Sequence, residues 1–190
     1  VKTGMLSNPD TVALVARKLH EYKAKNIVVD PVMIAKGGSP LLDDEAVANM
    51  VGMLFPQAAI ITPNIPEAEF ITKKKVATSS DMMEICYELA DMGAKAVLLK
   101  GGHMGTSEAN DLLFDGSNFH TFTSKRISTK NTHGTGCTLA SAIAANLAKG
   151  NSVFEAVSHA KEYIQGAIEN ADKLKIGSGH GPVHHFYWYY

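Results

Sequence analysis

Short hydrophobic runs alternate along this chain with longer segments in which apolar residues recur at helical spacing. The runs expected to form strands are VKTGML, NIVVD, AAIIT and KAVLLK, at residues 1–6, 26–30, 58–62 and 95–100, and the second and fourth are expected to be buried. Helical spacing predicts helices over 11–24, 45–55 and 79–94, one following Gly136, and one from about Ser152 to Ala171. Strands that alternate with helices predict an α/β fold with a mostly parallel sheet, covered on both faces.

Polar residues at the ends of these segments indicate where the elements begin and stop. Ser-Asn-Pro-Asp at 7–10 offers capping chemistry before the first helix, and Ser79 or Ser80 does so for the helix over 79–94. Gly93 is expected near the end of that helix. In DLLFDGSNFHTFTS, residues 111–124, an Asp-Gly pair between two strand-like runs predicts a β-hairpin.

Composition narrows the functional classes. The 190 residues suit one well-buried domain, expected over 1–190, and 45% hydrophobic with 19% charged residues is ordinary globular composition. A formal net charge of -1 argues against nucleic acid or an anionic membrane as partner, and Lys73–Lys75 is interpreted as a solvated loop. No apolar stretch approaches the roughly 18 residues of a membrane span. The two cysteines imply no disulfide framework, and Cys86 is predicted to be an inert core thiol, so we expect a cytoplasmic protein.

Residues with useful chemistry follow three of the predicted strands. Asp30 ends the second, Asn64 and Glu67 follow the third, and Lys100 ends the fourth. Because ligands of such sheets bind beyond the carboxyl ends of the strands, these residues could hold a divalent cation and polyphosphate oxygens. The alternative is local: NIPE fits a helix capping box, Asp30 caps a loop and Lys100 is a solvated strand end. Both interpretations stay open on these residues alone.

The segment NTHGTGCTLASAIAANLAKG, residues 131–150, places a Gly-Thr-Gly turn and Cys137 at the start of a helix rich in small residues. Glycines there let backbone N–H groups approach an anion, and the helix dipole favours negative charge. It is neither a Walker A loop nor a dinucleotide fingerprint. A tight turn with close packing at Ala140, Ala144 and Ala148 would explain the alanines but not Cys137. Because a helix start stabilises a thiolate, Cys137 could accept a proton from a substrate hydroxyl.

Taken together, the motifs resemble those of one enzyme family, the hydroxymethylpyrimidine and hydroxymethylpyrimidine-phosphate kinases of thiamine biosynthesis. The segments that carry the resemblance are VKTGMLS, DPVMIAKGG, ITPNIPEAE, VLLKGGH, TKNTHGTGCTLASAIAANLAKG and GSGHGPVHHF. It runs from Val1 to about Phe186 and implies a three-layer ribokinase-like fold. It also implies ATP-dependent phosphorylation of the hydroxymethyl group of a substituted pyrimidine, and then of its monophosphate.

The same resemblance implies roles for individual residues. Cys137 would be the catalytic base, where sugar kinases of the fold usually carry an aspartate, and a plain sugar kinase is therefore disfavoured. Asp30 and Glu67, with Asn64, would organise Mg²⁺, partly through water. The anion hole would consist of Gly134, Thr135 and Gly136. The ATP site would include Lys100, Asn64, Thr129 and His133, although an ordinary loop role fits His133 equally well. The pyrimidine pocket would include Gly4, Met5 and Val32.

Two alternative functions stay open beside the pyrimidine kinase. A pyridoxal kinase of the same cysteine-bearing branch is one, because pyridoxal also carries a hydroxymethyl group on a heteroaromatic ring. The other is a non-catalytic fragment that binds nucleotide or oligomerises, because family members begin with further strands and helices before Val1; we expect that part to be omitted from the sequence. The resemblance implies a homodimer. His180, His184 and His185 suggest a metal site, but the GHGP pattern favours a structural or dimer-contact role.

Overall fold

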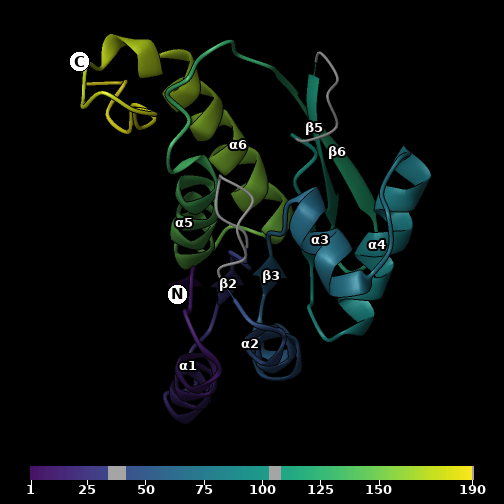
Figure 1. Ribbon diagram of the computed structural model, residues 1–190. Coiled ribbons are helices and arrows are strands. Elements are labelled where there is room, and N and C mark those ends of the chain that lie inside the picture. The colour runs from purple at the N-terminus through teal and green to yellow at the C-terminus, as the bar shows by residue number, and fades with distance from the viewer. Residues whose placement is uncertain (34–41, 103–107, 190) are drawn as a thin grey trace.

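The computed structural model describes residues 1–33, 42–102 and 108–189, and in these ranges a six-stranded sheet with order β1-β2-β3-β4-β5-β6 forms the centre (Figure 1). The parallel strands are β1 (Lys2–Thr3), β2 (Val28–Val29), β3 (Ile60–Ile61) and β4 (Val97–Leu99). The antiparallel hairpin is formed by β5 (Glu108–Phe114) and β6 (Phe119–Lys125). The predicted mostly parallel sheet and the hairpin are confirmed. The last residues of DPVMIAKGG and VLLKGGH lie outside the described residues.

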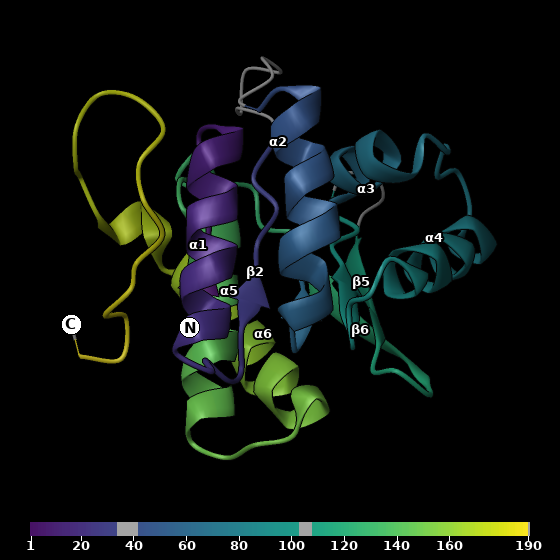
Figure 2. The same cartoon turned by 90° about the horizontal axis from the view of Figure 1, so that it is seen from below.

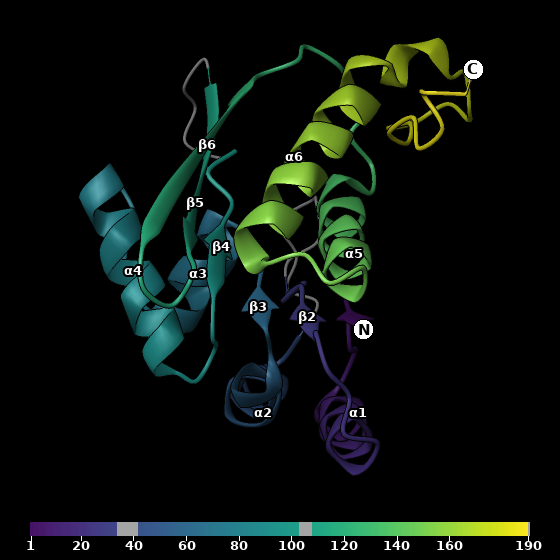
Figure 3. The same cartoon turned by 180° about the vertical axis from the view of Figure 1, so that it is seen from behind.

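Helices cover both faces of this sheet. They are α1 (Pro9–Glu21), α2 (Asp44–Asn49), α3 (Ile65–Thr72), α4 (Ser79–Asp91), α5 (Thr135–Ala148) and α6 (Val153–Glu169). Figure 3 shows α5 and α6 together on one face of the sheet, with α3 and α4 on the other. Figure 2 shows α1 and α2 side by side. None of the helices in the described part of the chain is long and apolar enough to cross a membrane.

Consecutive strand residues point into two separate hydrophobic cores. Val28 and Ile60 pack with α5 and α6, whereas Val29 and Ile61 pack with α1 to α4. All of these side chains are almost completely buried. Because both faces are covered, the strands are continuous apolar runs rather than alternating ones, as the sequence predicts for a parallel sheet.

Side-chain caps fix the helix ends. The cap of α1 comes from the expected cluster at 7–10: the Asn8 side chain accepts a backbone N–H of the first turn, and the helix begins at Pro9, two residues before the predicted start. The prediction that Ser79 or Ser80 caps α4 is wrong. Thr78 is the N-cap: its hydroxyl accepts the Asp81 N–H, and the Asp81 carboxylate accepts the Thr78 N–H in return. This reciprocal pair satisfies two amides at once, which a serine one position later in the helix cannot do.

Several elements are shorter than the pattern predicts. β1 and β2 pair over two residues each, within the expected runs 1–6 and 26–30, and Pro31 has no N–H to continue the ladder. The helix expected over 45–55 also changes its winding, because Pro56 removes an intrahelical donor. It divides into α2, a π-helical turn at Met50–Leu54 and a 3-10 turn at Phe55–Gln57.

The end of α4 supplies a test of this packing. Gly93 follows α4 with φ +112, and a Cβ there would lie 3.0 Å from Pro56 Cγ and 3.2 Å from Pro56 Cα. Gly93→Ala is therefore expected to lower the free energy of unfolding by about 1–3 kcal/mol, through backbone strain and steric contact.

Gly52 is the matched control, because its φ is not positive and a Cβ there would meet nothing within 4 Å. Gly52→Ala is expected to be neutral or stabilising by up to about 1 kcal/mol. Denaturant titration of both variants measures the difference. Equal stability of the two variants would contradict the contact between Gly93 and Pro56.

Candidate active site

The parallel register places the polar strand ends side by side. Val29 pairs with Ile61, so Asp30 lies next to Thr62, each being the first residue after its strand. Asn64 and Lys100 form an isolated parallel bridge that extends the pairing of β3 with β4. The residues that the sequence singles out after three strands therefore meet at one edge of the sheet.

Asp30 lies at the centre of this edge and is only 2% exposed. Its Oδ1 accepts from Lys100 Nζ at 3.1 Å and from Thr62 Oγ1 at 3.2 Å. Its Oδ2 lies 3.6 Å from Lys2 Nζ. Lys2 and Thr62 are missing from the residues predicted from the sequence. Thr62 could have been found, because it follows β3 as Asp30 follows β2. The contact of Lys2 with Asp30 could not, because it depends on the path of the lysine side chain in the folded protein.

Glu67 and Asn64 form the predicted capping box at the start of α3. Asn64 Oδ1 accepts the Glu67 N–H at 2.8 Å, and Glu67 Oε2 accepts the Asn64 N–H at 2.8 Å. Burial raises the pKa of Glu67 to about 7; the charge of Lys100 and the Asn64 N–H oppose this rise, and the charge of Asp30 adds to it. The capping box is confirmed. The Glu67 carboxyl group of this box lies at the sheet edge and changes charge near neutral pH.

The start of α5 presents backbone donors beside these charges. Gly134 is the N-cap with φ +81, and its carbonyl accepts the first intrahelical bond, from the Thr138 N–H at 2.8 Å. Thr135 bonds back to the preceding loop. The amides of Gly136 and Cys137 therefore have no acceptor in their own helix. Such amides, together with the helix dipole, favour an anion at this place.

Gly136 connects the helix start to the sheet edge. A Cβ on Gly136 would lie 3.4 Å from Lys100 Nζ, so the ammonium group reaches the first turn of α5. The absence of a side chain at this position lets the lysine approach the backbone amides. The structure thus brings together the Gly-Thr-Gly turn and Lys100, which lie far apart in the sequence.

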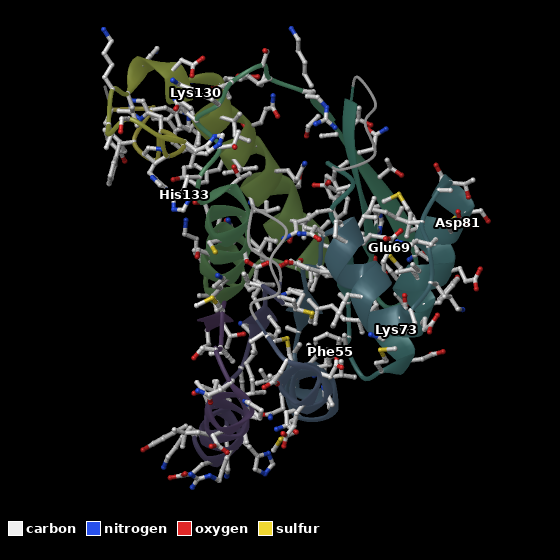
Figure 4. All side chains as sticks on the ribbon, in the orientation of Figure 1. Phe55, Glu69, Lys73, Asp81, Lys130 and His133 are labelled. Atoms are coloured by element: carbon white, nitrogen blue, oxygen red, sulfur yellow. The ribbon has the colours of Figure 1, made fainter. Side chains whose placement is uncertain are left out.

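Cys137 is a free, exposed thiol in the first turn of α5. It lines a groove of about 590 Å³ together with His133, Thr138, Tyr163 and His185. Figure 4 shows His133 at the amino-terminal end of α5. Cys86, by contrast, is fully buried within α4, where burial raises the pKa of its thiol to about 12. The prediction that Cys86 is a core thiol is confirmed.

The segment after α6 braces the loop that precedes the helix start. The His133 N–H donates to the Gly181 carbonyl at 3.0 Å, and the Val183 N–H donates to the His133 carbonyl at 3.3 Å. Asn131, which is 9% exposed, accepts the Gly181 N–H through Oδ1 at 3.1 Å. Thr129 donates its hydroxyl to the Asp172 carboxylate, in the segment after α6, and accepts the Asn131 N–H, so its hydroxyl is already engaged. Its contact with nucleotide stays a prediction.

The three C-terminal histidines contact different parts of the fold. A ring nitrogen of His180 lies 3.1 Å from the Lys130 carbonyl, and His185 Nε2 lies 3.1 Å from Thr138 Oγ1. The buried His184 donates its backbone N–H to Ala167. These contacts agree with a structural role. Across residues 1–33, 42–102 and 108–189 no group of three or more metal-ligating side chains gathers.

The residues expected at the pyrimidine follow the first two strands. The Val32 N–H donates to the Asp30 carbonyl at 2.8 Å, and Met5 is 53% exposed. A Cβ on Gly4 would lie 2.9 Å from Lys2 Nζ, so glycine leaves room for Lys2 to reach Asp30. These residues lie at the same edge as the charged cluster, and their contact with a substrate stays a prediction.

Fold and site together define a class of protein. The fifth strand of the sheet is antiparallel to both of its neighbours. At the carboxyl ends of the parallel strands, Lys100 meets the glycine-flanked start of α5. This combination is that of a ribokinase-like kinase. The family model of phosphomethylpyrimidine kinase matches residues 1–184. This chain belongs to the phosphomethylpyrimidine kinase family.

Individual relatives agree with this assignment. A hydroxymethylpyrimidine/phosphomethylpyrimidine kinase of Bacillus subtilis is 49% identical over 187 residues, covering 98% of this chain and 68% of the relative. A thiamine biosynthesis bifunctional protein of Geobacter sulfurreducens is 52% identical over 97% of this chain, which spans 37% of that longer protein. A solved pyridoxal kinase of Staphylococcus aureus in complex with ADP has TM-score 0.90 and 34% identity, covering 99% of this chain and 68% of the other.

The buried Glu67 carboxyl predicts a pH-dependent stability. The unfolded group ionises near 4.5 and the folded one near 7, so the wild type loses stability as the pH rises through this range. Glu67→Gln keeps an acceptor for the capping box and removes this loss. We expect its unfolding free energy relative to wild type to rise by on the order of 2–3 kcal/mol between pH 4 and pH 8.

Glu69 is the control of opposite sign. Hydrogen bonds from Lys75 and from the Val76 N–H hold the pKa of Glu69 below its ordinary value. Its contribution to stability is therefore present above the unfolded pKa and lost on acidification. Glu69→Gln should be less stable than wild type at neutral pH, with the difference vanishing in acid. Denaturant titration at several pH values measures both variants, and parallel pH profiles would refute the assignment.

Proposed function

We propose that this chain transfers a phosphoryl group from ATP to the hydroxymethyl group of 4-amino-5-hydroxymethyl-2-methylpyrimidine, and another to the resulting monophosphate. The name of the 49% identical Bacillus subtilis relative supports both acceptors. ADP in the Staphylococcus aureus pyridoxal kinase supports an adenine nucleotide as donor. Pyridoxal as acceptor fits less well, because that pyridoxal kinase is only 34% identical.

The observation that carries this proposal is the position of the Lys100 ammonium group. It lies 3.1 Å from Asp30 and beside Gly136 at the start of α5. Two lysines flank the single carboxylate of Asp30, so the cluster of Lys2, Asp30 and Lys100 carries a net positive charge. Positive charge beside amides that have no acceptor in their own helix suits a phosphoryl group in transfer, because such catalysis rests on positioning and charge neutralisation.

Cys137 would supply the base in this mechanism. Cys137 follows Gly136 directly and lies in the first turn of α5, where the helix dipole favours negative charge on the sulfur. The amides of Gly136 and Cys137 would hold the phosphoryl oxygens, and Lys100 would neutralise their charge. Cys137 Sγ would accept the proton of the substrate hydroxymethyl group as the hydroxyl oxygen attacks the γ-phosphorus of ATP, and ADP would leave as the bond between the γ-phosphorus and its bridging oxygen breaks. Of the anion hole expected at Gly134, Thr135 and Gly136, Thr135 would add no donor, because its N–H and its hydroxyl both donate to the Thr132 carbonyl. His133 borders the same groove.

Mg²⁺ would be held by Asp30 and Glu67 through oxygen atoms and water. The donor set fits, because Mg²⁺ prefers carboxylate oxygens and usually keeps several waters. The Glu67 carboxyl is destabilised as an anion by burial and by Asp30, and a divalent cation would relieve both effects. When bound, the ion would neutralise phosphate charge. Asn64 would hold Glu67 in place through the capping box.

We further propose that residues 1–190 form one domain of a cytoplasmic homodimer. The match of the family model over residues 1–184 supports the single domain. Size-exclusion chromatography with light scattering tests the homodimer, and a monomer at micromolar concentration would contradict it.

The function is tested by a coupled assay for ADP release, with hydroxymethylpyrimidine, Mg²⁺ and ATP. We expect turnover, and faster turnover than with pyridoxal as acceptor. Faster phosphorylation of pyridoxal would favour the alternative kinase. ATP binding by calorimetry without any turnover would instead favour the nucleotide-binding fragment, and the intact mass of the native protein would then show whether the chain is longer.

The role of Cys137 predicts a split between binding and chemistry. Cys137→Ala should lower kcat by at least about 100-fold, the range of a lost general base, and leave the Kd of ATP nearly unchanged. Steady-state kinetics and calorimetry measure the two effects. Cys86→Ala is the matched control: it removes a buried thiol from the core and should lower Tm while sparing kcat. Near-normal kcat in Cys137→Ala would remove the thiol from the mechanism.

A further inference from the structure

A buried ion pair connects the hairpin to helix α6. Lys161 Nζ lies 2.7 Å from Asp111 Oδ2, and the two side chains are 12% and 7% exposed. The other oxygen of Asp111, Oδ1, accepts the N–H of Gly101 at 2.8 Å. Gly101 directly follows Lys100. Neither member of the ion pair belongs to the cluster around Asp30, yet Asp111 binds the amide of the residue that follows the Lys100 of that cluster.

We propose that Asp111 and Lys161 form a positioning pair that fixes the backbone of Lys100 and thereby the place of its ammonium group. This inference rests on the proposed phosphate-binding role of Lys100. Asp111 and Lys161 would touch neither substrate nor nucleotide. They would act through the Gly101 amide.

The backbone on both sides of Lys100 is held by specific acceptors. The Lys100 N–H donates to the Pro63 carbonyl at 2.9 Å, which ties it to the end of β3. One residue later, the Gly101 N–H is taken by Asp111. A Cβ on Gly101 would lie 1.8 Å from the Asn110 carbonyl oxygen, so the chain is pressed against β5 where only glycine fits. Lys100 is thus held between two strands, and its side chain leaves from a fixed point.

Lys161 makes the second half of this arrangement possible. A buried carboxylate with only one amide donor would protonate or turn toward water. The ammonium group of Lys161 occupies Oδ2 and leaves Oδ1 directed at the Gly101 N–H. Helix α6 therefore supports the Lys100 backbone through a chain of two charge-assisted bonds, the kind of outer support that keeps a functional side chain in its geometry.

The competing explanation is that the pair only fastens α6 to β5. That role would change stability but not the action of Lys100. The two are separated by a double-mutant cycle with Lys100→Ala, because a residue acting through Lys100 has nothing left to position once the lysine is gone.

The kinetic test compares kcat/KM for ATP in Lys161→Met, in Lys100→Ala and in the double variant. We expect Lys161→Met to lose roughly 10- to 100-fold, as a misplacement near 1 Å does, and to add less than about twofold in the Lys100→Ala background. Lys161→Arg should recover most of the loss, because it keeps the charge. Independent, multiplicative losses, or no loss in Lys161→Met, would overturn the proposal. Where Lys161→Met does not fold, Asp111→Asn replaces it in the same cycle.

Lys74 is the matched control for the charge removal. It lies in the exposed Lys73–Lys75 run, and its ammonium group pairs with Glu84 at 2.9 Å and Glu88 at 2.8 Å, away from the site. Lys74→Met removes the same charge and should leave kcat/KM at the wild-type value. If Lys74→Met lost as much kcat/KM as Lys161→Met, the loss would be due to the change in net charge and not to the position of Lys161.

Amide hydrogen exchange gives a readout that needs no turnover. In Lys161→Met and Asp111→Asn, the Gly101 amide should exchange at least about tenfold faster, while the ladder amides of Leu112 and Leu113 keep their protection. Unchanged exchange at Gly101 would overturn the positioning pair by itself. A wild-type chain that binds no ATP would instead overturn the proposed function, and with it the kinetic consequence.

Discussion

A carboxylate almost removed from water organises one edge of this protein. Asp30 must keep fixed partners, because an unpaired buried charge is strongly destabilising. Asp30 follows β2, whereas Lys2 comes from β1, Thr62 follows β3 and Lys100 follows β4. All four strands therefore have to hold their register for the charge to be satisfied. The same requirement brings a second ammonium group to the site. While Glu67 is protonated, the edge therefore has an excess of positive charge that an anionic ligand could neutralise.

The start of α5 is held against this edge from several directions. Gly136 allows contact with Lys100 from the sheet side. On the other side, the C-terminal segment pairs with His133 and fills the space beside Asn131. The glycine turn would otherwise be a flexible loop, because its residues bury little apolar surface of their own. Its geometry is thus a property of the whole chain, including residues fifty positions away.

Some local signals in the sequence are sufficient to place an element of the fold. The strand runs, the hairpin and the cap at Asn8 follow from hydrophobic period and short-range hydrogen bonding, and all are present. The cap of α4 was predicted wrongly, because a one-residue shift between neighbouring polar side chains leaves the hydrophobic pattern unchanged. The π-helical turn before Pro56 was not predicted, because the hydrophobic pattern is the same whether or not a backbone donor is missing. The strand-end residues Asp30, Asn64 and Lys100 could be found because parallel strands end at the same edge.

The sequence by itself determined the alternation of strands and helices, the glycine turn before Cys137 and the family to which the chain belongs. These depend on period, on residue type and on motifs that can be compared directly. Only the tertiary structure decided that Lys2 and Thr62 share Asp30, that Lys100 reaches Gly136, and that Asp111 holds the backbone beside it. Such contacts depend on strand register and on side-chain paths across the fold. Residues distant in the sequence meet only after two cores have packed against opposite faces of one sheet.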